Sequence, residues 1–262
     1  MHRILIVLLL GLFSISCLDD EIEKKGFQVN EITEDESGQK IVGLQIDSLQ
    51  LEIQPKEVLL TFNAEHRLTP IYKVNYDKKT KRPWTGAVAH HTSWNYNTED
   101  GNDWNGHFMP GFEIVYGYNF VNVSHYNNAT KRENKLFDEP VLIKNLYYPA
   151  FSNDTLNYKA PVKREFYMVS VYDEDTNKDG FINIKDLRRF YYFNINGLAK
   201  KAFIPKDYSA MSSQYDRAND LMYVFARKDT NQNGQAELTE PIEIFWIDVK
   251  HPENFGKQYQ FE

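Results

Sequence analysis

Two short stretches of the chain carry oxygen-bearing side chains at regular spacing. They run from Asp175 to Asp186 and from Asp229 to Glu240, and the second begins 54 residues after the first. Each has Asp or Asn at its first, third and fifth positions, Gly at its sixth and a carboxylate at its twelfth. Calcium takes roughly six to eight oxygen ligands, which alternate residues of a tight loop supply, and the glycine permits the turn. The spacing therefore predicts a calcium site in each loop.

The expected ligands follow from this spacing. In the first loop they are Asp175, Asn177, Asp179, the Phe181 carbonyl, Asn183 (directly or through water) and Asp186. In the second loop they are Asp229, Asn231, Asn233, the Gln235 carbonyl, Glu237 through water and Glu240. Two asparagines replace carboxylates in the second loop and Ala236 fills its eighth position, so we expect the second site to be weaker. An Asx-rich turn without metal remains the alternative for both.

Both loops resemble the EF-hand calcium loop, and the first resembles its dockerin form, which also ends in Asp. A dockerin continues into a helix, whereas the aromatic and β-branched runs 166–172 and 190–195 around the first loop favour strands. Pro241 and an alternating run follow the second loop. We therefore expect both loops to join strands in hairpins, so that cohesin binding does not carry over and calcium acts as a structural staple.

The N-terminus has the pattern of an export signal. His2 and Arg3 precede an apolar run over 4–13, and small residues lead to Cys17, the sole cysteine. The run is too short to span a bilayer and predicts a signal peptide over 1–16. The stretch 14–17 resembles a bacterial lipoprotein cleavage box, which implies lipidation of Cys17 and an outer-membrane anchor. A secreted protein with an incidental cysteine is the alternative.

The residues after Cys17 bear on the orientation of the anchor. The acidic stretch 18–21 resembles the surface-export signal of Bacteroidota-type lipoproteins, which implies a protein that faces the extracellular side. A periplasm-facing anchor stays open.

Charge and cysteine content exclude several classes of function. Removing residues 1–16 takes away one Arg and leaves 29 Lys and Arg against 37 Asp and Glu, so nucleic acid is disfavoured as a partner. With Cys17 lipidated no thiol remains, which excludes disulfides and a cysteine nucleophile.

Strand-like runs dominate the chain from residue 41 onward, and no window keeps a helical period. We expect an acidic tether over 17–41 and a single all-β domain over 42–262, with a propeller-like or sandwich-like array of hairpins. The hairpins resemble TolB-like propeller blades. The expected strands are 41–53, 58–62, 71–76, 112–118, 120–126, 141–148, 166–172, 190–195, 221–225 and 242–249.

A segment rich in histidine and tryptophan lies between residues 84 and 110. Three interpretations are open: a metal-dependent hydrolase, a glycan-binding surface or a protein contact. The hydrolase would use His90, His91, Asp103 and His107, whose spacing matches no zinc motif. The other two would use Trp84, Trp94 and Trp104, and aromatic enrichment of interface cores favours the protein contact.

The chain as a whole resembles uncharacterised Bacteroidota lipoproteins described as EF-hand-domain-containing, which have no assigned activity. The sequence contains no G-x-S-x-G elbow, no glycine-rich phosphate loop and no carboxylate pair placed for acid–base catalysis. We therefore expect a non-enzymatic, calcium-binding outer-membrane lipoprotein. Its expected role is that of an accessory subunit of a β-barrel complex for transport, secretion or protein assembly. A glycan-binding surface module is the alternative, and the hydrolase is the second alternative.

Overall fold

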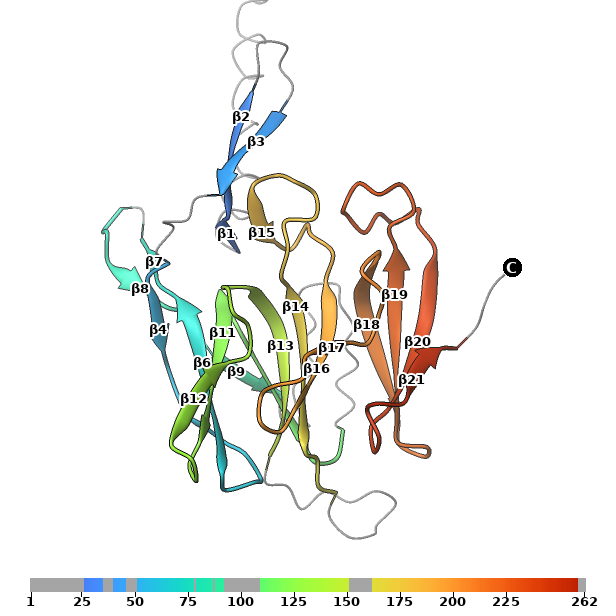
Figure 1. Ribbon diagram of the computed structural model, residues 1–262. Helices are drawn as coiled ribbons and strands as arrows, with labels where there is room; N and C mark the ends of the chain where they lie inside the picture. Colours follow the sequence, from blue (N-terminus) through green and yellow to red (C-terminus); the bar gives the residue numbers. More distant parts are fainter. Residues whose placement is uncertain are drawn as a thin grey trace, which may run out of the picture.

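The computed structural model describes residues 26–34, 40–45, 51–77, 79–86, 88–91, 109–150 and 162–258 (Figure 1). Over 30–34, 40–45 and 88–91 it describes the backbone alone. These residues form strands and no helix, which confirms the all-β class predicted from the sequence. The predicted signal peptide, Cys17, Trp94, Asp103, Trp104 and His107 lie outside the described residues. In the described part no helix is long and apolar enough to cross a membrane.

Three antiparallel sheets form the body. The first sheet has the order β12 (Arg132–Lys135), β11 (Phe120–Asn127), β6 (His66–Lys73) and β4 (Ile53–Pro55), with β5 (Leu59–Leu60) also paired to β6. The central sheet has the order β17 (Lys201–Ala202), β16 (Arg189–Asn194), β14 (Phe166–Tyr172), β13 (Leu142–Pro149), β10 (Phe112–Gly117) and β9 (Val88–His91). The last sheet is a meander of β18 (Tyr208–Asp216), β19 (Leu221–Lys228), β20 (Ile242–Asp248) and β21 (Phe255–Lys257).

The central sheet is buried on both faces, and β14 shows how the sequence achieves this. All seven of its residues are buried. Tyr167, Val169 and Val171 join a core with Leu68 and Phe120 of the first sheet. Because successive strand residues point to opposite faces, the residues between them face the last sheet.

The second core fills the space between the central and last sheets. Phe166, Met168 and Phe190 of the central sheet pack there with Val224 and Ile247 of the last sheet. The three sheets therefore stack face to face, with the central sheet in the middle (Figure 1).

Three two-stranded elements lie outside these sheets. They are β1 (Gly26–Gln28) with β15 (Phe181–Asn183), β2 (Asn30–Glu34) with β3 (Lys40–Gln45), and β7 (Asn75–Tyr76) with β8 (Pro83–Trp84). A third, smaller core lies beside the first of these and joins Phe27 of β1 and Ile182 of β15 to Ile71, Leu142 and Tyr172.

Most predicted strands occur near their predicted places, but three regions differ. Residues 26–28, predicted as tether, form β1 because Phe27 has an apolar cluster to enter. The run 41–53 divides into β3 and β4, and residues 46–50 lie outside the described part. Strand β18 was not predicted because serine and glutamine interrupt its apolar alternation.

Candidate calcium-loop pair

The first loop, 175–186, connects β14 to β16, and β15 lies inside it. The second loop, 229–240, connects β19 to β20. Both therefore join strands, in the positions that the sequence predicts, and they lie at the same end of the molecule (Figure 1).

The first loop is closed by its two end carboxylates. Asp175 accepts the backbone N–H of Asp179 at 3.0 Å and of Gly180 at 2.9 Å. Asp186 accepts the N–H of Thr176 and of Asn183, both at 2.8 Å. Gly180 has a φ of 85°, a conformation that glycine adopts at little cost.

The second loop repeats this scheme position by position. Asp229 accepts the N–H of Asn233 at 3.1 Å and of Gly234 at 2.9 Å. Glu240 accepts the N–H of Thr230 at 2.7 Å and of Glu237 at 3.0 Å. Two loops 54 residues apart thus use their first and twelfth side chains in the same way.

The side chains at positions three, five and nine also meet within each loop. In the first loop, the Asp179 carboxylate lies 3.2 Å from the Asn177 amide and 3.4 Å from the Asn183 amide. In the second, Glu237 accepts from the amides of Asn231 at 3.3 Å and Asn233 at 2.6 Å. The predicted ligand side chains of each loop are therefore brought together.

Carboxylates in these loops are buried without a cationic partner. Asp186 is 2% exposed, and Asp229 and Glu240 are each 7% exposed. Within the described residues, no Lys or Arg forms an ion pair with any of the three. Burying a carboxylate without a cationic partner is costly, and the backbone N–H groups offset only part of this cost at Asp186, so a bound cation would stabilise its charged form.

The pKa values of the two twelfth-position carboxylates reflect this burial differently. Burial and, to a smaller extent, the negative charge of Asp175 raise the pKa of Asp186 to about 6. The backbone N–H groups from which Asp186 accepts hydrogen bonds lower this pKa but do not cancel the rise. Burial also opposes the ionisation of Glu240, but the N–H groups of Glu237, Thr230 and Asn231 outweigh it and hold the pKa of Glu240 below its usual value.

The donor set fits a hard cation. In the described part of the chain, no group of three or more His, Cys, Asp or Glu side chains is placed to hold a metal by itself. By sequence, each loop combines carboxylates with asparagine oxygens. Oxygen ligands of this mixed kind suit calcium and not a transition metal, which prefers imidazole or thiolate.

The two loops touch each other. The Thr176 hydroxyl donates to the Gly234 carbonyl at 2.6 Å. Gly234 lies so close to the first loop that an added Cβ would stand 1.9 Å from the Thr176 carbonyl oxygen. Only glycine fits there, and the pair behaves as one packed unit.

Strand β1 supports the first loop from the other side. Phe27 pairs with Ile182, the eighth residue of the loop, and Gly26 pairs with Asn183. An added Cβ on Gly26 would stand 2.2 Å from the Ile182 carbonyl oxygen, so glycine is required at this approach as well. The chain that leads back toward Cys17 is therefore attached directly to the first loop.

A cleft of about 600 Å³ separates the outer parts of the two loops. Ile184 and Lys185 lie on one wall and Glu237 and Leu238 on the other, with Ala210 of β18 among the remaining lining residues. Ile184 and Leu238 hold the tenth position of their respective loops, and they are 51% and 90% exposed.

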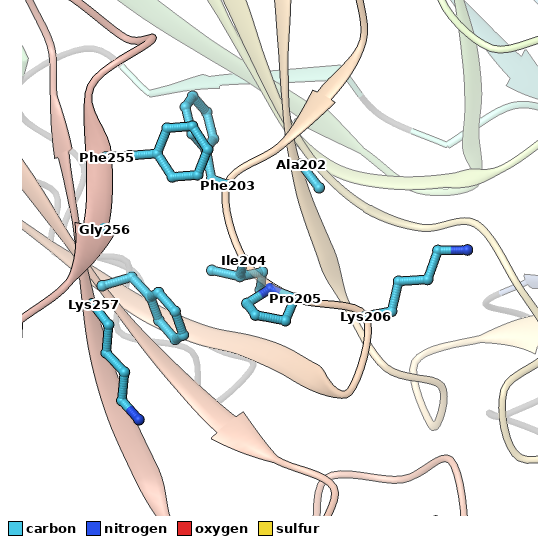
Figure 2. A pocket seen from close by; sticks show the side chains of 9 residues that line it. Ala202, Phe203, Ile204, Pro205, Lys206, Phe255, Gly256 and Lys257 are labelled. Atoms are coloured by element: carbon cyan, nitrogen blue, oxygen red, sulfur yellow. The ribbon is translucent and has the colours of Figure 1, made fainter. Parts of the chain in front are cut away.

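A second, apolar hollow of about 360 Å³ lies between the segment after β17 and the last sheet (Figure 2). Phe203, Ile204 and Phe255 line it, while the side chains of Lys206 and Lys257 extend away from it. It presents no convergent polar groups that would orient a ligand.

The histidine and tryptophan segment is described only in part. His90 and His91 lie next to each other on β9, where their backbones pair with Val115 and Ile114. Trp84 on β8 is 41% exposed. Its ring centroid lies 5.2 Å from that of Tyr118, and the two rings are tilted by 35°. Trp94, Asp103, Trp104 and His107 lie outside the described residues. The hydrolase set and the tryptophan surface therefore remain predictions from the sequence.

Several residues that connect the loops to their surroundings were not predicted from the sequence. Thr176 and Thr230 both hold position two and both contact the carboxylate at position twelve, at 3.2 Å in each case. The threonine at position two is repeated in both loops, and this repetition could have identified the two residues from the sequence. No local sequence pattern indicated the close approach of Gly26 to the first loop or the exposed positions of Ile184 and Leu238.

Comparison with known proteins adds little to this geometry. No family model matches the chain, and no curated protein matches it. Among solved structures, the crystal structure of the tricorn protease matches with 11% identity and a TM-score of 0.29. That match covers 86% of this chain and 22% of the protease chain, so this chain spans about a fifth of that protein. A likeness this slight transfers neither fold nor activity.

Proposed function

We propose that the chain is a calcium-stabilised, non-enzymatic lipoprotein, anchored to the outer membrane through Cys17 and exposed on the cell surface. Its role is that of an accessory subunit of a β-barrel complex. The observation that carries the calcium assignment is the repeated hydrogen-bonding scheme of two loops far apart in the sequence. The anchor and the complex rest on the sequence of residues 1–21.

The metal would act as a staple. Both loops connect neighbouring strands and pack against each other through Thr176 and Gly234. A bound ion would neutralise buried carboxylates and fix both connections. At a calcium concentration ten times the dissociation constant, one site adds about 1.4 kcal/mol to the free energy of unfolding.

Calorimetric melting with calcium and with excess chelator tests this assignment. We expect the melting temperature to fall when calcium is removed, because the buried carboxylates of both loops lose their counter-ion. The Glu240→Gln variant removes one charge from the second loop, and we expect it to retain only the stabilisation that the first loop provides.

A matched variant, Glu253→Gln, controls for loss of a carboxylate. Glu253 is exposed and forms only a 3.6 Å surface contact with His251, so we expect its calcium response to equal that of the wild type. A melt of the wild-type protein that chelator does not change would contradict the calcium assignment.

The accessory-subunit role has its own test. Affinity purification from native membranes in a gentle detergent should recover a β-barrel protein with this chain. Recovery of this chain alone would count against the role without affecting the calcium assignment.

A further inference from the structure

The calcium-loop pair and the N-terminal attachment lie at the same end of the molecule (Figure 1). Gly26 pairs with Asn183 in the first loop, and Cys17 precedes Gly26 by nine residues. Nine extended residues reach about 30 Å. The proposed lipid anchor would therefore lie within about 30 Å of Gly26, which is on the loop side of the molecule.

This end carries two exposed aliphatic side chains at matching positions. Leu238 is 90% exposed, the highest value among the described large hydrophobic residues, and Ile184 is 51% exposed. Both belong to the walls of the 600 Å³ inter-loop cleft. Neither contributes to the cores that join the sheets.

The charges of the loop end depend on calcium. The first loop contains three Asp and two Lys, a net charge of −1, and the second contains one Asp and two Glu, a net charge of −3. Two calcium ions would bring the total from −4 to zero. Lys178 and Lys185 are exposed in the first loop, where they suit lipid phosphate groups.

We propose that the loop pair is a membrane-docking surface, on which Ile184 and Leu238 enter the interfacial region of the bilayer that carries the anchor. The inference rests on the proposed function for its anchor and its calcium. A lipid anchor already holds the protein at the membrane, so two side chains suffice to set its orientation without supplying independent affinity. The loops are suited to this because their backbones are fixed by internal hydrogen bonds.

Site-specific fluorescence on vesicles tests the docking. The mature chain, with Cys17→Ser and an N-terminal polyhistidine tag, is tethered to vesicles of phosphatidylethanolamine and phosphatidylglycerol that contain a nickel-chelating lipid, in buffer with calcium. Single cysteines replace Leu238 or Ile184 and carry an environment-sensitive dye. We expect blue-shifted emission and at least about twofold quenching by nitroxide-labelled lipid at both positions.

The matched control is Leu198→Cys. Leu198 is 57% exposed and lies in the turn that follows the far end of β16, away from the loops. We expect its emission to remain that of a water-exposed dye. Both Leu198 and Leu238 lie on the surface, so all variants should fold, and circular dichroism checks this.

The outcomes separate docking from the proposed function. Dyes at positions 184 and 238 that stay water-exposed on calcium-loaded vesicles would overturn the docking surface. Protection of those dyes only in native outer membranes, and not on vesicles, would overturn it as well and assign the face to a protein partner. Lipidation of Cys17, measured by mass spectrometry of the native protein, and calcium binding, measured by calorimetry, test the proposed function independently.

Discussion

Thr176 joins the two loops through one hydroxyl group. The hydroxyl group donates to the Gly234 carbonyl at 2.6 Å, and its oxygen accepts the Leu187 N–H at 2.8 Å. Thr230, the equivalent residue of the second loop, is exposed and contacts only its own loop. The same residue type at the same loop position therefore has two different structural roles.

The Thr176→Val variant measures this connection, because valine keeps the shape and removes both hydrogen bonds. We expect a loss of about 1–3 kcal/mol in the free energy of unfolding, since the Gly234 carbonyl and the Leu187 N–H lose their partner. Thr230→Val should cost less than about 1 kcal/mol, because water replaces its bond. Denaturant unfolding of both variants checks the difference, and equal losses would contradict the inter-loop role.

A buried pair of histidines gives the molecule a dependence on pH. His66 and His125 are 3% and 1% exposed, and Nδ1 of His66 lies 3.1 Å from Nε2 of His125. Burial lowers the pKa of both side chains, and the charge of His125 lowers the pKa of His66 further. Both are therefore neutral in the folded protein over a range where unfolded histidine is charged.

The sign of the pH effect follows from these lowered pKa values. The two histidines take up protons in the unfolded chain below pH about 6.5, before they do so in the folded protein, so their contribution to folding stability is complete above that pH and falls as pH decreases. Each histidine contributes a slope of up to about 1.4 kcal/mol per pH unit. Urea unfolding between pH 7.5 and 5.5 should show a smaller slope for His66→Gln, whereas the exposed-site variant His251→Gln should keep the wild-type slope.

At the scale of elements, β1 supports the first loop by pairing with β15. Phe27 is 5% exposed and packs with Ile182 and Tyr172. The Phe27→Ala variant should cost about 3–5 kcal/mol in unfolding free energy, as large-to-small changes in a core do. It should also weaken calcium binding at the first loop while leaving the second loop unchanged, because only the first pairs with β1. Calcium titration calorimetry distinguishes the two sites, and an equal effect on both would contradict this assignment.

The elements also show what the sequence could and could not predict. The central strands were predictable because runs such as 166–172 are dense in β-branched and aromatic residues. The geometry inside each loop was predictable because the hydrogen bonds that close it join residues of the same loop. Strand β1 was not, because three residues in a polar stretch carry no pattern until Ile182 supplies their partner. The meeting of Gly234 with Thr176 joins residues 58 positions apart and has no sequence signature.

At the scale of the whole molecule, a buried ion pair ties the central and last sheets at the end opposite the loops. Arg164 precedes β14, and Asp220 lies in the turn between β18 and β19. Their side chains form two hydrogen bonds of 2.9 and 2.7 Å, and Arg164 also donates to the Val249 carbonyl at 2.8 Å. The Tyr215 hydroxyl donates to the same carboxylate at 2.7 Å.

The Asp220→Asn variant tests this tie. Asp220 has a φ of 57°, which asparagine tolerates, so the change removes charge without straining the backbone. We expect a loss of about 3–5 kcal/mol, because Arg164 keeps a buried charge without its partner. Asp216→Asn, at the end of β18 and only partly buried, should cost less than about 1 kcal/mol. Thermal or denaturant unfolding compares them, and similar losses would contradict the role of the ion pair.

The attachment of β1 to the first loop has a mechanical consequence. Any pull that enters the described residues from the N-terminal side acts on Gly26, and three residue pairs carry it into the first candidate calcium loop. Gly26 also donates its N–H to the Asn119 side chain at 2.9 Å and accepts the Lys73 ammonium group at 3.0 Å, so tension there reaches the first sheet as well. Tension on the proposed anchor would therefore act on the geometry of the first loop as soon as it reaches the folded body.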